Sequence, residues 1–73
     1  MSRTDTIYTE TWRVHVIAPD GRVERSTQCV GPTAEKTARD YFDALCIPGS
    51  WRQLQVRRAG KHRYVVVESN LMR

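Results

Sequence analysis

The densest group of side chains that could do chemistry lies between residues 57 and 63. Cations packed this closely repel one another unless an anion lies between them. Arginine forks and a lysine ammonium suit contact with phosphate or with an acidic protein surface. The alternative is that charged strand ends protect a sheet edge from aggregation. The charged residues gather around a glycine, which is typical of a tight turn; they are Arg57, Arg58, Lys61, His62 and Arg63.

These residue types form no pattern for catalysis. His15 falls on a predicted strand and His62 in the basic segment, and neither has a sequence neighbour that would complete a triad. The sequence has no glycine-rich phosphate loop, HExxH helix or acidic metal cluster. We therefore expect a protein that binds without catalysing a reaction and that uses no cofactor and no metal.

The two cysteines, Cys29 and Cys46, stand where the pattern favours apolar side chains. We expect buried free thiols. A disulfide between them is an alternative, but a reducing compartment would keep the thiols unpaired. A metal or redox role is a further alternative, but the sequence has no Cys/His spacing typical of zinc.

Length and composition fit one small domain. The chain has 73 residues, 40% of them hydrophobic and 27% charged, with a formal net charge of +4. The basic excess favours an anionic partner, although solubility alone also explains it. No apolar stretch is long enough to span a membrane, and the polar N-terminal residues precede no secretory segment. We expect a cytoplasmic protein with no membrane partner, folded over residues 1–73 with frayed ends at 1–6 and 70–73.

Residues 7–18 and 22–30 are predicted to form a strand hairpin. Apolar and polar residues alternate along the first segment, and Pro-Asp-Gly at 19–21 is a strong turn signal. A three-residue loop with a bulge at Gly21 would set Val23 opposite Ile17. We prefer a four-residue loop, which collects apolar side chains on one face and turns Arg25 inward beside Val16. The pairs in that register are Ala18 with Val23, Val14 with Thr27 and Trp12 with Cys29.

A helix and a second hairpin follow. Gly-Pro-Thr at 31–33 ends the strand and opens the helix, with Thr33 as the N-cap. Residues 51–58 and a segment that ends near residue 69 are predicted as strands joined by a two-residue turn at 60–61. That register pairs Val56 with Val65 and Leu54 with Val67. The helix presents one apolar stripe, formed by Ala34, Ala38, Tyr41, Phe42 and Leu45.

The element order predicts an α+β fold, ββαββ, with a four-stranded antiparallel sheet in the order 2-1-3-4 and one helix packed on one face. A single helix covers only one face, so the other face meets water or a partner. The uncovered face would combine cations and amides with two aromatic rings. Its predicted members are Thr11, Arg13, His15, Ser26, Gln28, Trp51, Gln53, Gln55, Arg57, Tyr64 and Val66.

This mixture resembles a nucleic-acid platform, because cations hold phosphates and rings stack on bases. We predict binding to nucleic acid, a nucleoprotein or an acidic protein surface through the basic hairpin and the open face, with Tyr64, Arg13, His15 and Trp51 as further contacts. One alternative is an ordinary solvated face, on which the two rings cover neighbouring aliphatics. Another is a protein-interaction module or a homodimer that uses the sheet face or the strand edges.

The APDGR turn, the GPTAEKTARDYFDAL helix and the second basic hairpin resemble, in layout and composition over the whole chain, small orphan accessory proteins of bacteriophages with actinobacterial hosts. The layout is also similar to small anti-CRISPR proteins, whose cations compete for the nucleic-acid path of a surveillance complex. The resemblance implies a phage-encoded inhibitor of a host system, acting in the cytoplasm of the bacterial host. By type and location it extends to Arg57, Arg58, Lys61 and Arg63.

Overall fold

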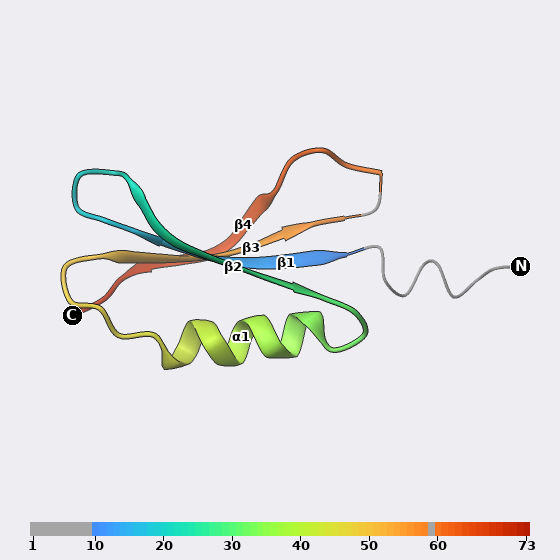
Figure 1. Cartoon of the computed structure of the whole chain (residues 1–73), viewed down its shortest axis with the longest axis horizontal. Helices are drawn as coiled ribbons and strands as arrows, with labels where there is room; N and C mark the ends of the chain where they lie inside the picture. The colour runs from blue at the N-terminus through green and yellow to red at the C-terminus, as the bar shows by residue number, and fades with distance from the viewer. Residues whose placement is uncertain (1–9, 59) are drawn as a thin grey trace, which may run out of the picture.

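The computed structural model describes residues 10–58 and 60–73. The described elements are β1 (Thr11–Ile17), β2 (Val23–Val30), α1 (Ala34–Ala44), β3 (Trp51–Arg57) and β4 (Val65–Leu71). The strands form one antiparallel sheet in the order β2-β1-β3-β4, and α1 lies along one face of it (Figure 1). The predicted ββαββ fold and its strand order are confirmed. The strand start predicted at residues 7–9 and the fraying predicted for 1–6 lie outside the described residues.

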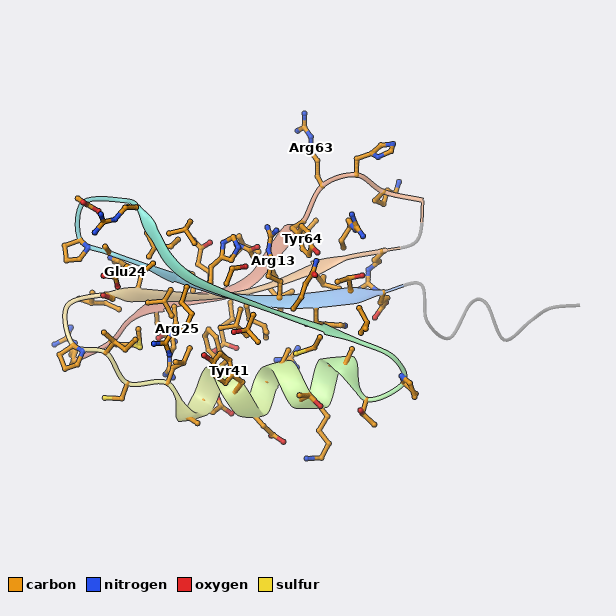
Figure 2. All side chains as sticks on the ribbon, viewed as in Figure 1. Arg13, Glu24, Arg25, Tyr41, Arg63 and Tyr64 are labelled. Atoms are coloured by element: carbon orange, nitrogen blue, oxygen red, sulfur yellow. The ribbon has the colours of Figure 1, made fainter. Side chains whose placement is uncertain are left out.

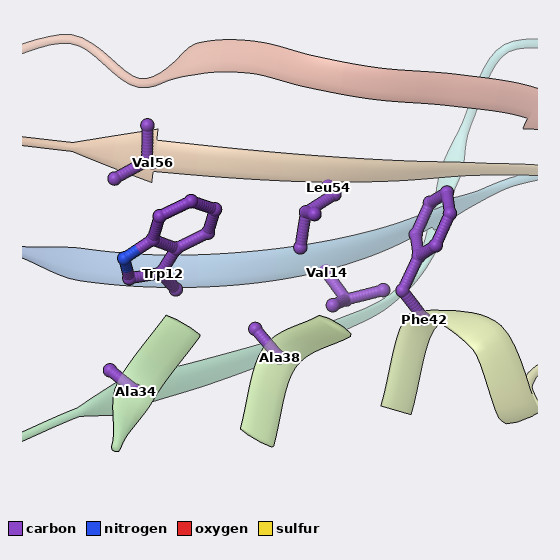
Figure 3. Packing of buried hydrophobic residues seen from close by; sticks show 7 residues of the cluster. All are labelled: Trp12, Val14, Ala34, Ala38, Phe42, Leu54 and Val56. Carbon is purple, nitrogen blue, oxygen red and sulfur yellow. The ribbon is translucent and has the colours of Figure 1, made fainter. Parts of the chain in front are cut away.

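The core lies between α1 and the sheet. Ala34, Ala38 and Phe42 recur every four residues along α1 and face alternate residues of β1 and β3. The alanines of the first turns are small enough for the helix to approach the sheet beside Trp12 (Figure 3). The buried cluster consists of Trp12, Val14, Ala34, Ala38, Phe42, Leu54 and Val56.

The first hairpin combines both registers that the sequence allows. At the turn, the amide of Ala18 donates to the carbonyl of Arg22 (2.8 Å) and Gly21 has a φ of +93°, as a three-residue loop with a bulged glycine requires. Val23 therefore lies opposite Ile17, and the predicted four-residue loop is wrong. Further along, the preferred pairs are found: Val14 with Thr27, Trp12 with Cys29 and Val16 with Arg25.

A β-bulge in β2 joins the two registers of this hairpin. The register shifts between Val16 and Ile17, so that Glu24 is the extra residue of β2. The shift puts Val23 on the open face but keeps Thr27 and Cys29 opposite the buried side chains of β1. Arg25 faces the helix side, next to Tyr41 (Figure 2). Hydrogen bonding with Thr27 and Arg25 lowers the pKa of Tyr41.

The second hairpin also contains a bulge. Val56 pairs with Val65 as predicted, but Leu54 lies opposite Glu68 instead of Val67, because the register shifts between Leu54 and Gln55. The turn is not the predicted two-residue turn: the amide of Lys61 donates to the carbonyl of Arg58 (3.1 Å). The shift turns Glu68 toward α1, where its carboxylate lies 3.9 Å from Arg39.

The C-terminal residues are fixed by contacts, which corrects the fraying predicted for 70–73. β4 continues to Leu71, and Met72 is only 4% exposed. The amide of Met72 donates to the carbonyl of Ser50 (2.9 Å), and its carbonyl accepts from Gly49 (3.1 Å). These backbone bonds join segments that are distant in the chain, which a local sequence pattern does not indicate.

Two further predictions need correction. Both cysteines are free, but Cys29 is half-buried, with a pKa raised by burial, and Cys46 is exposed. Cys46 lies beyond the end of α1, where the apolar stripe no longer faces the sheet. Thr33 precedes α1 as predicted, but its side chain makes no cap hydrogen bond, because its backbone (φ −109°, ψ 18°) is not extended as an N-cap residue requires.

Candidate functional site

Polar side chains from three strands and the second hairpin meet on the sheet face opposite α1. We call this group the open-face cluster. Arg13 and Tyr64 lie together at its centre (Figure 2). The alternation of β1 and β3 turns these side chains away from the core. The members of the cluster are Arg13, Gln28, Gln55, Arg57 and Tyr64.

Tyr64 is held on several sides. The guanidinium carbon of Arg13 lies 3.4 Å from the ring centroid, and that of Arg57 lies 5.4 Å from it. The Tyr64 hydroxyl accepts a hydrogen bond from Nε2 of Gln28 (2.8 Å). Cations stacked on a ring are attracted by its quadrupole. Tyr64 therefore fixes two cations in place and does not offer a bare ring for stacking.

Gln55 is the buried polar centre of the same face. It is 6% exposed, accepts from Nε of Arg13 (2.7 Å) and donates to Oε1 of Gln53 (2.9 Å). Its Nε2 also lies 3.4 Å from Nδ1 of His15. Burial, and then the charge of Arg13, lower the pKa of His15. His15 therefore favours the neutral form and adds a polar group, not a charge, to the face.

An apolar row crosses the other end of this face. The strand register sets Val23 opposite Ile17, Ile17 opposite Trp51 and Trp51 opposite Leu71. Trp51 is 44% exposed. Both bulges are needed for this row, since regular pairing would have placed Val23 and Leu71 on the helix side. Trp51 is thus the ring on this face that is open to stacking.

The predicted basic group does not form one patch. Arg57 belongs to the open-face cluster, whereas Arg58 forms an ion pair with Glu10. Lys61 and Arg63 are exposed on the loop with His62, and Arg63 points away from the sheet (Figure 2). Within residues 10–58 and 60–73, neither Lys61 nor Arg63 lies within ion-pair distance of an acid.

All nine predicted contact residues are described by the structure, and they fall into groups. One group is held together by the stacking on Tyr64 and by the hydrogen bonds of Gln55, and it consists of Arg13, His15, Arg57 and Tyr64. Trp51 lies at the far end of the face, and the remaining four lie in the hairpin. The prediction placed Gln28 and Gln55 on the face but not among the contacts. Alternation alone could not show that Gln55 is buried, because that depends on the side chains around it.

Comparison with protein families, with curated proteins and with solved structures found no match to this chain. Among the described residues, no helix is long and apolar enough to cross a membrane. No group of three or more His, Cys, Asp or Glu side chains in the described part of the chain could hold a metal ion. The functional argument therefore depends on the geometry of the open face.

Proposed function

We propose that this protein binds single-stranded nucleic acid, alone or within a nucleoprotein, across the open face of its sheet. One observation carries the proposal: two arginines are fixed around Tyr64 at one end of this face, and Trp51 is exposed at the other. The cations suit phosphates, and an exposed indole suits an unpaired base. Bases in a duplex are already stacked on one another, which is why a single strand fits better.

The Arg13 side chain is preorganised to bind a phosphate. Its Nε is bound to Gln55 and its plane is stacked on Tyr64, so the side chain is ordered before a ligand arrives. The contacts described for Arg13 use Nε, which leaves the two terminal nitrogens for a phosphate oxygen pair. Lys61 and Arg63 add positive field at the same end of the sheet. The proposal is of binding, with no catalytic step.

The finer proposal is that binding of this kind lets the protein compete for the nucleic-acid path of a host complex. Its support is the layout and the position of the hairpin cations. Lys61, Arg63 and Arg57 would make the contacts that compete with the nucleic acid. Competition with a guide strand for an isolated surveillance complex would test it separately from binding itself.

A labelled oligothymidylate, followed by fluorescence anisotropy at two salt concentrations, tests the main proposal. R13Q/R57Q should weaken binding and lower the salt slope by about 1.4, since each phosphate contact to a single strand contributes about 0.7. R22Q/K36Q removes the same charge from exposed positions away from the cluster. Equal losses in the two double variants would reduce the effect to net charge and contradict the proposal.

The apolar row favours a second candidate, a protein interface on the same face. Val23, Trp51 and Leu71 are each more than two-fifths exposed. Val23 and Trp51 lie on either side of Ile17, and Leu71 lies beyond Trp51. Exposed apolar groups of this kind mark protein contacts. Light scattering at two protein concentrations tests it: a dimer that persists in high salt, and that W51A disrupts, would support this candidate.

A further inference from the structure

β4 is a sheet edge with consecutive apolar side chains in the open. Val65, Val66 and Val67 are 63%, 47% and 44% exposed. α1 leaves them uncovered because it packs mainly against β1, β2 and β3. The other edge strand, β2, carries Glu24 and Arg25. Charged residues protect an edge from pairing with another chain, and these three positions of β4 carry none; the bulge at Val67 is what interrupts this edge.

A hollow of about 620 Å³ lies beside the valines. It is lined by Val56 and the three β4 valines, and by hairpin residues that include Lys61 and Arg63. None of the open-face residues Arg13, Tyr64 and Trp51 lines it. A volume of this size can take several side chains of a ligand. The hollow is therefore a second surface, with an apolar floor and a basic end.

We propose that β4 and this hollow form a docking site for an extended peptide of a partner protein, with aliphatic side chains at alternate positions and acidic residues at one end. The peptide would add to the sheet as a further strand, hydrogen-bonded to the outer edge of β4. Its aliphatic side chains would lie against Val65 and Val67, which both line the hollow. Its acidic end would meet Lys61 and Arg63, for which the described residues provide no acidic partner.

The charges favour such a peptide over a second copy of this chain. β4 of another copy would bring valines, but its acidic residue is Glu68, which already lies near Arg39. Each copy also carries a net charge of +4, and its own hairpin would add cations to the assembly. A second copy therefore matches the floor of the hollow but not its basic end.

The probes are two labelled synthetic peptides of alternating valine and threonine, one with an aspartate pair at its N-terminus and one with the pair at its C-terminus. Anisotropy with the full chain should show binding of one of them. V65N/V67N should weaken that binding by more than about tenfold, and K61Q/R63Q should weaken it and reduce its salt dependence. The matched control is V30N, since Val30 is 68% exposed on the opposite edge. V30N should bind as the parent does.

A peptide methylated at alternate backbone nitrogens tests the strand pairing itself. It should bind poorly, because it cannot complete the ladder of hydrogen bonds. Equal binding of the methylated peptide, or equal effects of V30N and V65N/V67N, would overturn the proposal. Displacement of the peptide by oligothymidylate that persists in K61Q/R63Q would also overturn it, because the two ligands would then share the apolar floor of the hollow and not only these two cations. Failure of both peptides together with a dimer that V65N/V67N dissociates would assign the edge to a second copy.

Discussion

Arg13 and Tyr64 stack at 3.4 Å although their elements are not neighbours in the sheet. Arg13 is on β1 and Tyr64 directly precedes β4, with β3 between them. The Tyr64 hydroxyl reaches further, to Gln28 on β2. Tyr64 thus links the second hairpin to both strands of the first hairpin. The consequence is that side chains, as well as the backbone, set the position of the basic loop.

Replacing Arg13 by lysine tests this link. Lysine keeps the charge but loses the planar stacking on Tyr64 and the Nε bond to Gln55. We expect R13K to lower the free energy of unfolding by about 1 kcal/mol, measured by urea denaturation. R57K is the matched control, since the Arg57 guanidinium lies farther from the ring, at 5.4 Å. A loss in R57K as large as that in R13K would contradict the special role of Arg13.

Trp51 should report nucleic-acid binding by its fluorescence. Trp12 is buried in the core, whereas Trp51 is 44% exposed on the open face. A base stacked on Trp51 should quench the emission when oligothymidylate is added. W51A should remove the quenching and weaken binding by about 1–3 kcal/mol, the usual contribution of one stacked base. The emission of Trp12 remains in W51A, and quenching of that signal would place the ligand elsewhere.

The sequence predicted most of the fold because periodicity fixes which face a residue occupies. Val14, Leu54 and Phe42 lie in the core as the alternation and the helical stripe predict. The predicted strand order is also correct. What it missed depends on bulges at Glu24 and Val67. A bulge adds one residue to one strand, and the gain comes from contacts across the sheet that a local pattern does not contain.

The candidate site shows the same division. The open-face residues were predicted by alternation, but the stacking of Arg13 on Tyr64 was not, because it joins elements that are distant in the chain. The predicted basic group does not act as one patch, because Glu10 pairs with Arg58 and so removes it from the group. Density of charge along the chain therefore overestimated how many cations face one ligand.

The bulge in β4 should tolerate deletion. Removing Val67 leaves Val66 opposite Gln55 and Glu68 opposite Leu54, so the pairs on both sides keep their faces. We expect the free energy of unfolding to change by no more than about 1 kcal/mol. Deleting Gln53 is the control, because β3 pairs with β1 without a bulge, so the deletion turns Arg52 and Trp51 to the wrong faces. Thermal unfolding should show the Gln53 deletion to be much less stable, and equal stability would contradict the observed register.

Arg52 should stabilise the end of α1. Its guanidinium donates to the carbonyls of Phe42 and Leu45 and, through Nε, to Oδ1 of Asn70 (2.7 Å). The Phe42 carbonyl otherwise accepts a long bond (3.4 Å) from the amide of Leu45, which that amide shares with Tyr41, so a cation there supplements weak terminal bonding and complements the helix dipole. R52M keeps most of the apolar stem and should lower the free energy of unfolding by about 1–3 kcal/mol. R22M, at an exposed position in the first turn, should have little effect, and similar losses in both variants would count against the capping role.

His15 should make the fold less stable in mild acid. Burial and the charge of Arg13 lower its pKa below the ordinary value of 6.5, so the unfolded chain takes up the proton at higher pH than the folded chain does. The contribution of His15 is fully present above pH 6.5 and is lost as the pH falls toward the folded-state pKa. H15Q should therefore flatten the pH dependence of the urea midpoint as the pH falls below 6.5. An anion bound at Arg13 would cancel part of the repulsion, so oligothymidylate should raise the pKa of His15 in an NMR titration. A pKa of His15 that does not change on binding would place the nucleic acid away from Arg13. An H15Q slope equal to that of the parent would show that His15 does not cause the pH dependence of stability.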